Sequence, residues 1–144
     1  MLKRIHPFAG VLGFLTILTF WTATVVTELS GSTAAIVAVK RAIPWGLLIL
    51  VPALAMAGAS GFRLSRGWQD PRVAMKKRRM PFIAGNGIVI LIPAALTLSV
   101  LASRGDLGPT FYAVQSIELV AGAVNLVLMG LNIRDGLRIG RLRN

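Results

Sequence analysis

The chain has 144 residues, of which 55% are hydrophobic and 15% charged, and its formal net charge is +11. This composition is far from that of a soluble domain and is typical of a single-domain polytopic membrane protein. The sequence has no cysteine, which excludes disulfides, thiol nucleophiles and cysteine-bound iron–sulfur clusters. The basic residues are divided among several juxtamembrane segments, so we expect them to meet anionic lipid headgroups and not nucleic acid.

Four apolar stretches are long enough to cross a bilayer, because about 20 helical residues cover the hydrocarbon core of about 30 Å. We predict spans over about residues 8–29, 43–62, 81–102 and 111–133. The first is longer than the apolar part of a signal peptide, so we interpret it as a retained span. The sequence therefore predicts an all-α integral membrane protein, a four-transmembrane-helix bundle that forms one domain over residues 1–144.

The distribution of charge predicts the orientation of these spans. Thirteen of the sixteen lysines and arginines precede the first span, follow the fourth, or lie between the second and third. Only Lys40, Arg41 and Arg104 occupy the other two connections. By the positive-inside rule, the N-terminus, the C-terminus and the middle connection are then cytoplasmic. We expect a multi-pass protein of the inner (cytoplasmic) membrane.

The middle connection covers residues 63–80. Its Asp70-Pro71 pair is typical of a helix N-cap followed by proline in the first turn, which predicts a brief surface helix. Four consecutive basic residues lie on that helix, and we expect them to contact anionic lipid headgroups. They are Lys76, Lys77, Arg78 and Arg79.

Polar residues form one stripe along the otherwise apolar fourth span. Spacings of three and four connect Gln115, Glu118, Gly122, Asn125, Met129 and Asn132. Lipid cannot satisfy an amide or a carboxyl group, so the stripe must face the bundle interior or a partner. The third span carries a matching amide at Asn86, for which Asn125 and Asn132 are the expected partners.

Glu118 is the candidate site residue, because carboxyl groups about 10 Å inside a span are rare. One interpretation is a structural ion pair with Lys40 or Arg41 at the outer mouth of the second span. A second is a titrating group for proton- or cation-coupled transport, and a third is a protonated, hydrogen-bonded carboxyl. Glu28, at the outer end of the first span, is expected to be a surface partner of Lys40 or Arg41.

His6 is the only histidine, which excludes a multi-histidine metal site and a bis-histidine haem within one chain. A b-type haem with one histidine and one methionine ligand stays open, with Met80 or Met129 as the second axial ligand. A helix cap or a headgroup contact is the simpler role for a lone histidine at a membrane interface.

Three functional hypotheses follow, since no nucleophile–base pair, phosphate-binding loop or paired carboxylates indicate an enzyme. The first is an accessory or assembly subunit that binds a larger membrane complex through helix–helix contacts, using the polar stripe. The second is a small proton- or cation-coupled transporter that uses Glu118 and assembles as a homo-oligomer, because four helices seldom enclose a pathway alone. The third is a haem-binding membrane protein that uses His6.

Overall fold

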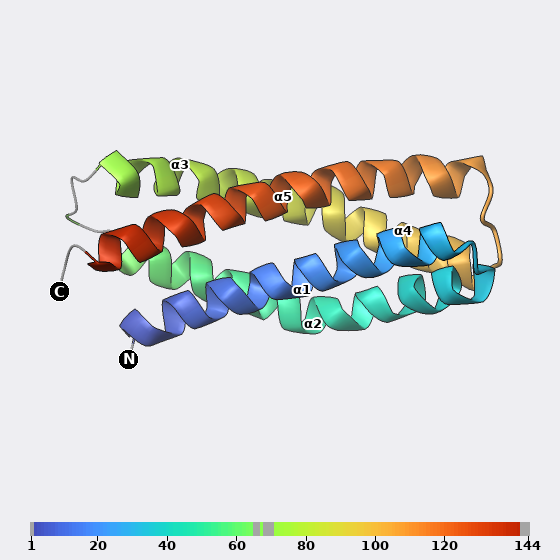
Figure 1. The fold of residues 1–144 in the computed structure, drawn as a ribbon, viewed down its shortest axis with the longest axis horizontal. Helices are drawn as coiled ribbons and strands as arrows, with labels where there is room; N and C mark the ends of the chain where they lie inside the picture. Colours follow the sequence, from blue (N-terminus) through green and yellow to red (C-terminus); the bar gives the residue numbers. More distant parts are fainter. Residues whose placement is uncertain (1, 65–66, 68–70, 142–144) are drawn as a thin grey trace.

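The computed structural model describes residues 2–64, 67 and 71–141, and over these residues the regular structure is entirely helical. The helices are α1 (Leu2–Ser30), α2 (Thr33–Leu64), α3 (Pro71–Asn86), the π-helical segment η1 (Gly87–Leu91), α4 (Ile92–Ser103) and α5 (Pro109–Arg141). They form one elongated bundle, in which α3, η1 and α4 follow one another as a single long element (Figure 1). Four described stretches are long and apolar enough to cross a membrane, which confirms the predicted number of spans.

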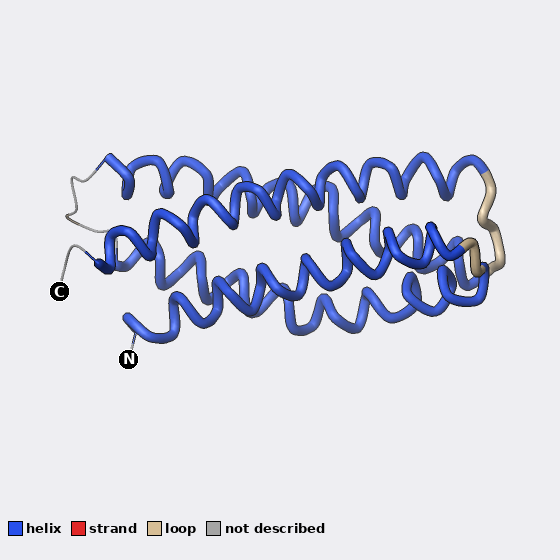
Figure 2. Tube along the Cα trace, viewed as in Figure 1, coloured by secondary structure: helices blue, strands red, loops and turns tan. Residues whose placement is uncertain are grey.

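The elements run antiparallel in succession, so the bundle has two distinct ends. Both termini lie at one end, here called the terminal end (Figure 1). The opposite end, here called the hairpin end, contains the short connections that join α1 to α2 and α4 to α5 (Figure 2). Around the bundle α1 contacts α2 and α5, and α4 contacts the same two helices. The α1 helix therefore lies diagonally across from the third element.

Glycines close both connections at the hairpin end. Gly31 follows α1 with φ of 65°, and its N–H donates to Glu28 O at 3.1 Å. Gly105 follows α4 with φ of 71°, and the next N–H, from Asp106, donates to Leu101 O at 2.9 Å. Left-handed glycines of this kind end helices and satisfy their last carbonyls, which permits the abrupt reversals.

The helix predicted between the second and third spans begins at Pro71 as expected, but it is not a brief, separate surface helix. The helix that begins at Pro71 continues into the third span without a break, although Pro81 lies inside it. The extra turns pack along α5, which itself extends to Arg141, and Val73 and Ile83 are buried on α3. Asp70, the predicted N-cap, lies outside the described residues.

The third element changes its winding at η1. The Ile92 N–H donates to Gly87 O, which is the i to i+5 pattern of a π-helix. Pro93 follows one residue later and has no N–H to donate, so the local departure from α geometry falls where proline removes a backbone hydrogen bond. Pro44 and Pro52 lie inside α2, which is one helix from Thr33 to Leu64.

The interior has two apolar clusters. The first joins Ile17, Leu50, Ile83 and Met129 from all four elements. The second lies toward the hairpin end and contains Ile36, Leu98, Ala102 and Phe111. Large apolar side chains also cover the outside, including Phe8 at 69% and Leu48 at 67% exposure, as expected for a surface that faces lipid.

Candidate functional site

The polar stripe of α5 faces the inside of the bundle. Gln115, Asn125 and Asn132 are all buried, and Asn125 is 0% exposed. The sequence allows this stripe to face either the bundle interior or a partner protein. In the structure its buried residues face the bundle interior. Its polar side chains meet partners from the other helices in three groups, one near each end of the bundle and one between them.

The group near the hairpin end is built around an ion pair. Lys40 Nζ of α2 contacts Glu118 Oε2 of α5 and donates to Thr24 Oγ1 of α1 at 3.2 Å. The Lys40 side chain is only 2% exposed and that of Glu118 12%. Of the two basic residues considered as partners for Glu118, Lys40 makes the contact, whereas Arg41 is exposed.

The phase of α2 explains why Lys40 turns inward. The helix begins at Thr33, ten residues before the predicted span, so Lys40 belongs to its regular part. Buried residues follow one face at helical spacing, and this list includes the lysine: Ile36, Lys40, Ile43 and Leu50. Because Lys40 lies on this buried face, its side chain cannot point to lipid or water unless the whole helix rotates.

Glu28 and Gln115 complete the same group. Gln115 Nε2 donates to Glu28 Oε1 at 2.7 Å, so Glu28 binds an amide of α5 and not the expected surface ion-pair partner. Glu28 is also close enough to Lys40 to act electrostatically on its charge. Gln115 Oε1 is buried and has no hydrogen-bond partner among the described residues. We call Thr24, Glu28, Lys40, Gln115 and Glu118 the hairpin-end cluster.

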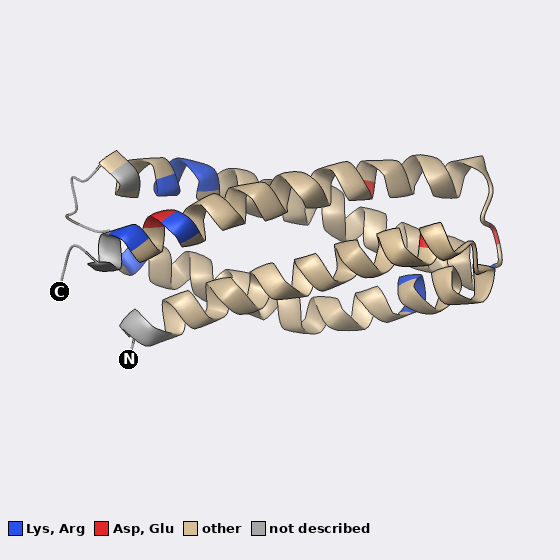
Figure 3. Cartoon of the chain, viewed as in Figure 1, with Lys and Arg blue, Asp and Glu red and all other residues tan. Residues whose placement is uncertain are grey.

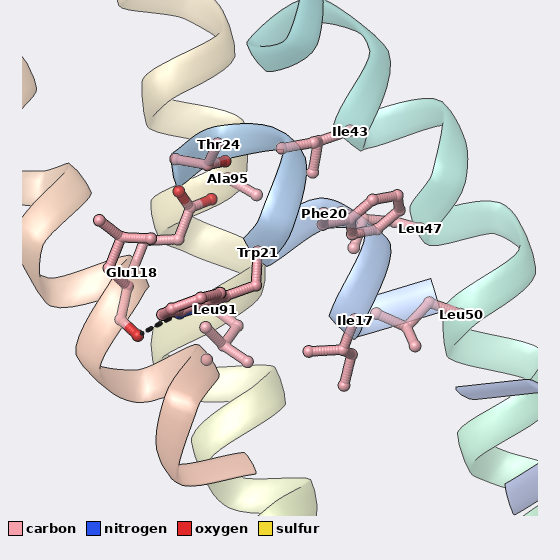
Figure 4. A pocket seen from close by; sticks show the side chains of 12 residues that line it. Ile17, Phe20, Trp21, Thr24, Ile43, Leu47, Leu50, Leu91, Ala95 and Glu118 are labelled. Carbon is pink, nitrogen blue, oxygen red and sulfur yellow. Dashed lines mark hydrogen bonds between the residues drawn. The ribbon is translucent and has the colours of Figure 1, made fainter. Parts of the chain in front are cut away.

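A cavity of about 50 Å³ lies beside this cluster. Its wall is mostly aliphatic and aromatic, and Glu118, Thr24 and Trp21 are its polar residues (Figure 4). The Glu118 carboxyl points toward Thr24 in this view. The Trp21 indole is fixed by donating from Nε1 to Leu119 O at 2.9 Å, and it packs on Gly122. The volume is sufficient for at least one water molecule.

Two amides form the middle group. Asn86 Nδ2 donates to Asn125 Oδ1 at 2.9 Å and to Ala121 O at 2.8 Å. Asn125 Nδ2 in turn donates to Ile83 O at 3.4 Å. Asn86 therefore contacts Asn125, one of its two expected partners, and the pair joins α3 to α5 directly beside η1.

The terminal end holds the third group, here called the terminal-end cluster, which contains His6, Ser60, Lys76, Arg79, Asn132 and Asp135. Arg79 donates from Nη1 to Asp135 Oδ2 at 2.7 Å and to Asn132 Oδ1 at 3.4 Å. Lys76 Nζ lies 3.1 Å from His6 Nε2. Figure 3 shows the basic residues concentrated at this end.

The headgroup prediction for the four consecutive basic residues therefore needs correction for two of them. Lys76 and Arg79, three residues apart on one face of α3, have the protein partners just described. The correction has the same cause as that of the surface helix: α3 packs along α5 here. Arg78 is exposed and Lys77 is half-buried, and for these two the headgroup contact stays a prediction.

His6 is held by polar contacts from α2 and α3, and its role as an axial haem ligand stays a prediction. Its Nδ1 lies 3.0 Å from both Ala57 O and Ser60 Oγ, and its Nε2 faces Lys76, so both ring nitrogens have protein partners. Met80 reaches the same region, since a Cβ added at Gly61 would lie 2.5 Å from Met80 Cε and 3.0 Å from His6 Cε1. Met129 belongs instead to the first apolar cluster.

Sequence reasoning missed Asp135 and Thr24. Asp135 follows Asn132 by three residues and thus extends the polar stripe, but it lies beyond the predicted end of the fourth span. Thr24 is one of five threonines in α1, and the sequence does not distinguish it from Thr16, Thr19 and Thr27, which donate to carbonyls of their own helix.

No protein-family model, curated protein or solved structure matches this chain. Function must therefore be inferred from the chemistry of the buried polar groups.

Proposed function

We propose that the protein is a small proton-coupled transporter and that the hairpin-end cluster binds the coupling proton. The observation that carries the proposal is the Lys40–Glu118 ion pair, which is buried between three helices at the wall of a cavity. Charged side chains in a membrane interior are costly, and they typically mark ion pathways or proton relays.

The charges of the cluster support a site for one further positive charge. The cluster contains two carboxylates, Glu28 and Glu118, and one ammonium, that of Lys40, so the three groups carry a formal charge of −1 when all are ionised. The buried Gln115 Oε1 adds an acceptor without a donor. A proton bound to a carboxylate balances the charge, because the acid becomes neutral.

A proton fits this cluster better than a metal cation does. Among the described residues, no three histidine, aspartate or glutamate side chains are grouped so that they could hold a metal ion. Hard cations need about six oxygen ligands, which the two carboxylates and one free amide oxygen do not supply. Coupling to sodium or potassium is the alternative, and the flux experiment distinguishes it from coupling to protons.

Protonation of Glu118 gives the cluster two states. In the ionised state Glu118 holds Lys40 together with Thr24. When Glu118 takes up a proton, its attraction for the ammonium falls and Lys40 moves toward Glu28, the remaining carboxylate. Because Glu118 also lines the cavity, this movement changes the polarity of the cavity wall and couples proton binding to its contents.

The accessory-subunit hypothesis loses one of its grounds, the use of the polar stripe as a partner surface. The buried members of that stripe have partners within the chain. For the transporter we further propose a homo-oligomer, because four helices seldom enclose a complete pathway. We also propose the inner membrane as its location, with the terminal end in the cytoplasm.

The experiment is a flux measurement with the full chain in proteoliposomes under imposed proton, sodium and potassium gradients. We expect proton flux that Glu118→Gln lowers at least tenfold. The matched control is Asp106→Asn, which removes an exposed carboxyl at the same end and should leave the flux unchanged. Absence of flux with every ion, or equal flux in Glu118→Gln and the native protein, would contradict the proposal, and flux with sodium or potassium alone would replace the proton.

A further inference from the structure

The terminal end contains a second pair of titratable groups, which the hairpin-end cluster does not use. His6 of α1 and Lys76 of α3 approach to 3.1 Å between Nε2 and Nζ. Both side chains are half-buried, and a Cβ added at Gly136 of α5 would lie 3.6 Å from Lys76 Nζ. The pair therefore lies where α1, α3 and α5 meet, with α2 on the far side of the imidazole.

The hydrogen bonds fix the tautomer of His6. A carbonyl oxygen can only accept, so the 3.0 Å contact with Ala57 O requires a proton on Nδ1. Ser60 agrees with this assignment, because its hydroxyl proton is donated to Met56 O at 2.5 Å and its oxygen is left to accept from Nδ1. In the neutral ring Nε2 then has a free lone pair, which accepts a hydrogen bond from the Lys76 ammonium.

The pair consequently holds one positive charge and not two. If His6 were also protonated on Nε2, two cationic donors would face each other at hydrogen-bond distance. The other charged groups nearby do not remove this conflict. Asp135 of α5 acts on Lys76 but is bound to Arg79, and Arg63 of α2 and Arg134 of α5 are exposed.

We propose that His6 and Lys76 form the proton-exchange site of the terminal end, which transfers protons between the bundle interior and the water on that side. This inference rests on the proposed function, since a proton that enters at one end must leave at the other. It assigns a chemical role to the only histidine, the one side chain whose ordinary titration range includes neutral pH.

The transfer is balanced within the pair. The Nζ–H bond of the Lys76 ammonium breaks and an Nε2–H bond forms on His6, which leaves a neutral amine and an imidazolium. The imidazolium releases its Nε2 proton to water, and the amine accepts the next proton from the interior. Asp135 lies level with Lys76, and Arg79, Asn132 and the Asn86–Asn125 pair follow toward the interior along α3 and α5.

The first test is proton flux in the proteoliposomes described above. His6→Asn keeps a donor for Ala57 O but lacks the Nε2 acceptor, and we expect it to reduce flux by about 100-fold, the effect of losing a proton-transfer group. Imidazole added on the terminal side, and not on the hairpin side, should restore flux in His6→Ala. Lys76→Met removes the other member of the pair. Its control is Arg78→Met, which removes an exposed positive charge from the same helix.

The second test is nitrogen NMR of protein labelled in histidine, in which every ring signal comes from His6. We expect a protonated Nδ1 and an unprotonated Nε2 at neutral pH, and an Nε2 shift that changes in Lys76→Met but not in Arg78→Met. A protonated Nε2 in the neutral ring, undiminished flux in His6→Asn, or failure of imidazole to restore flux would overturn the inference. Absence of flux in the native protein would instead overturn the proposed function.

Discussion

At the scale of single residues, the Lys40 ammonium and the Glu118 carboxylate compensate each other's buried charge. Lys40 is 1% exposed, and its ammonium is satisfied by one carboxylate and one hydroxyl from two other helices. Removal of one member of a buried pair leaves the other charge without compensation, whereas removal of both members does not. The two kinds of variant therefore distinguish a buried ion pair from two independent polar residues.

We expect Lys40→Met to destabilise the folded protein by about 3–5 kcal/mol, because it leaves the Glu118 carboxylate unpaired. The double variant Lys40→Met with Glu118→Met should recover most of that loss, since it leaves neither charge buried. Unfolding of the detergent-solubilised protein by denaturant measures both. Additive losses in the double variant would show that the two side chains do not interact.

The sequence predicted part of this residue-level picture. The spacing of three and four along the fourth span placed Gln115, Asn125 and Asn132 on one buried face, and it limited the partner of Asn86 to two residues. It did not choose between Lys40 and Arg41, because that choice depends on where α2 begins and hence on its rotation. The acceptor of the Trp21 indole is the carbonyl of Leu119, and backbone acceptors leave no trace in a sequence.

At the scale of the helices, close approach between α1 and α2 shapes the cavity beside the hairpin-end cluster. Phe20 lies over Gly46 so closely that a Cβ at this position would overlap its ring. Phe20 also lines the cavity, so the glycine permits both the packing of the two helices and the position of that wall. The boundaries of the helices were less predictable than their number, since several extend past the apolar residues that define a span.

Gly46→Ala should therefore destabilise the bundle by about 1–3 kcal/mol through overpacking against Phe20. Gly58→Ala is the matched control in the same helix, because nothing lies within 4 Å of a Cβ added there. It should be neutral or slightly stabilising, as alanine favours a helix over glycine. Thermal unfolding of both variants compares them, and equal melting temperatures would refute the close contact.

At the scale of the whole molecule, the two ends carry different chemistry. The hairpin-end cluster contains two carboxylates and one ammonium, whereas the terminal-end cluster has more basic than acidic groups. Figure 3 shows this difference along the length of the bundle. With the terminal end in the cytoplasm, protons would reach Glu118 from outside the cell and leave past His6.

Reporter fusions test that orientation. A reporter after Asn144 should be cytoplasmic, and one inserted beside Asp106 should be external. The reason is that most basic residues lie in the segments outside the spans at the terminal end. Activity of a cytoplasmic reporter at Asp106 would reverse the direction of the proposed pathway.

The central claim is that Glu118 takes up the coupling proton, and infrared difference spectroscopy of the reconstituted protein measures this directly. Lowering the pH should produce the C=O band of a protonated carboxylic acid that is absent from Glu118→Gln and present in Asp106→Asn. An identical difference spectrum for Glu118→Gln and the native protein would show that another group takes up the proton, and it would contradict the account.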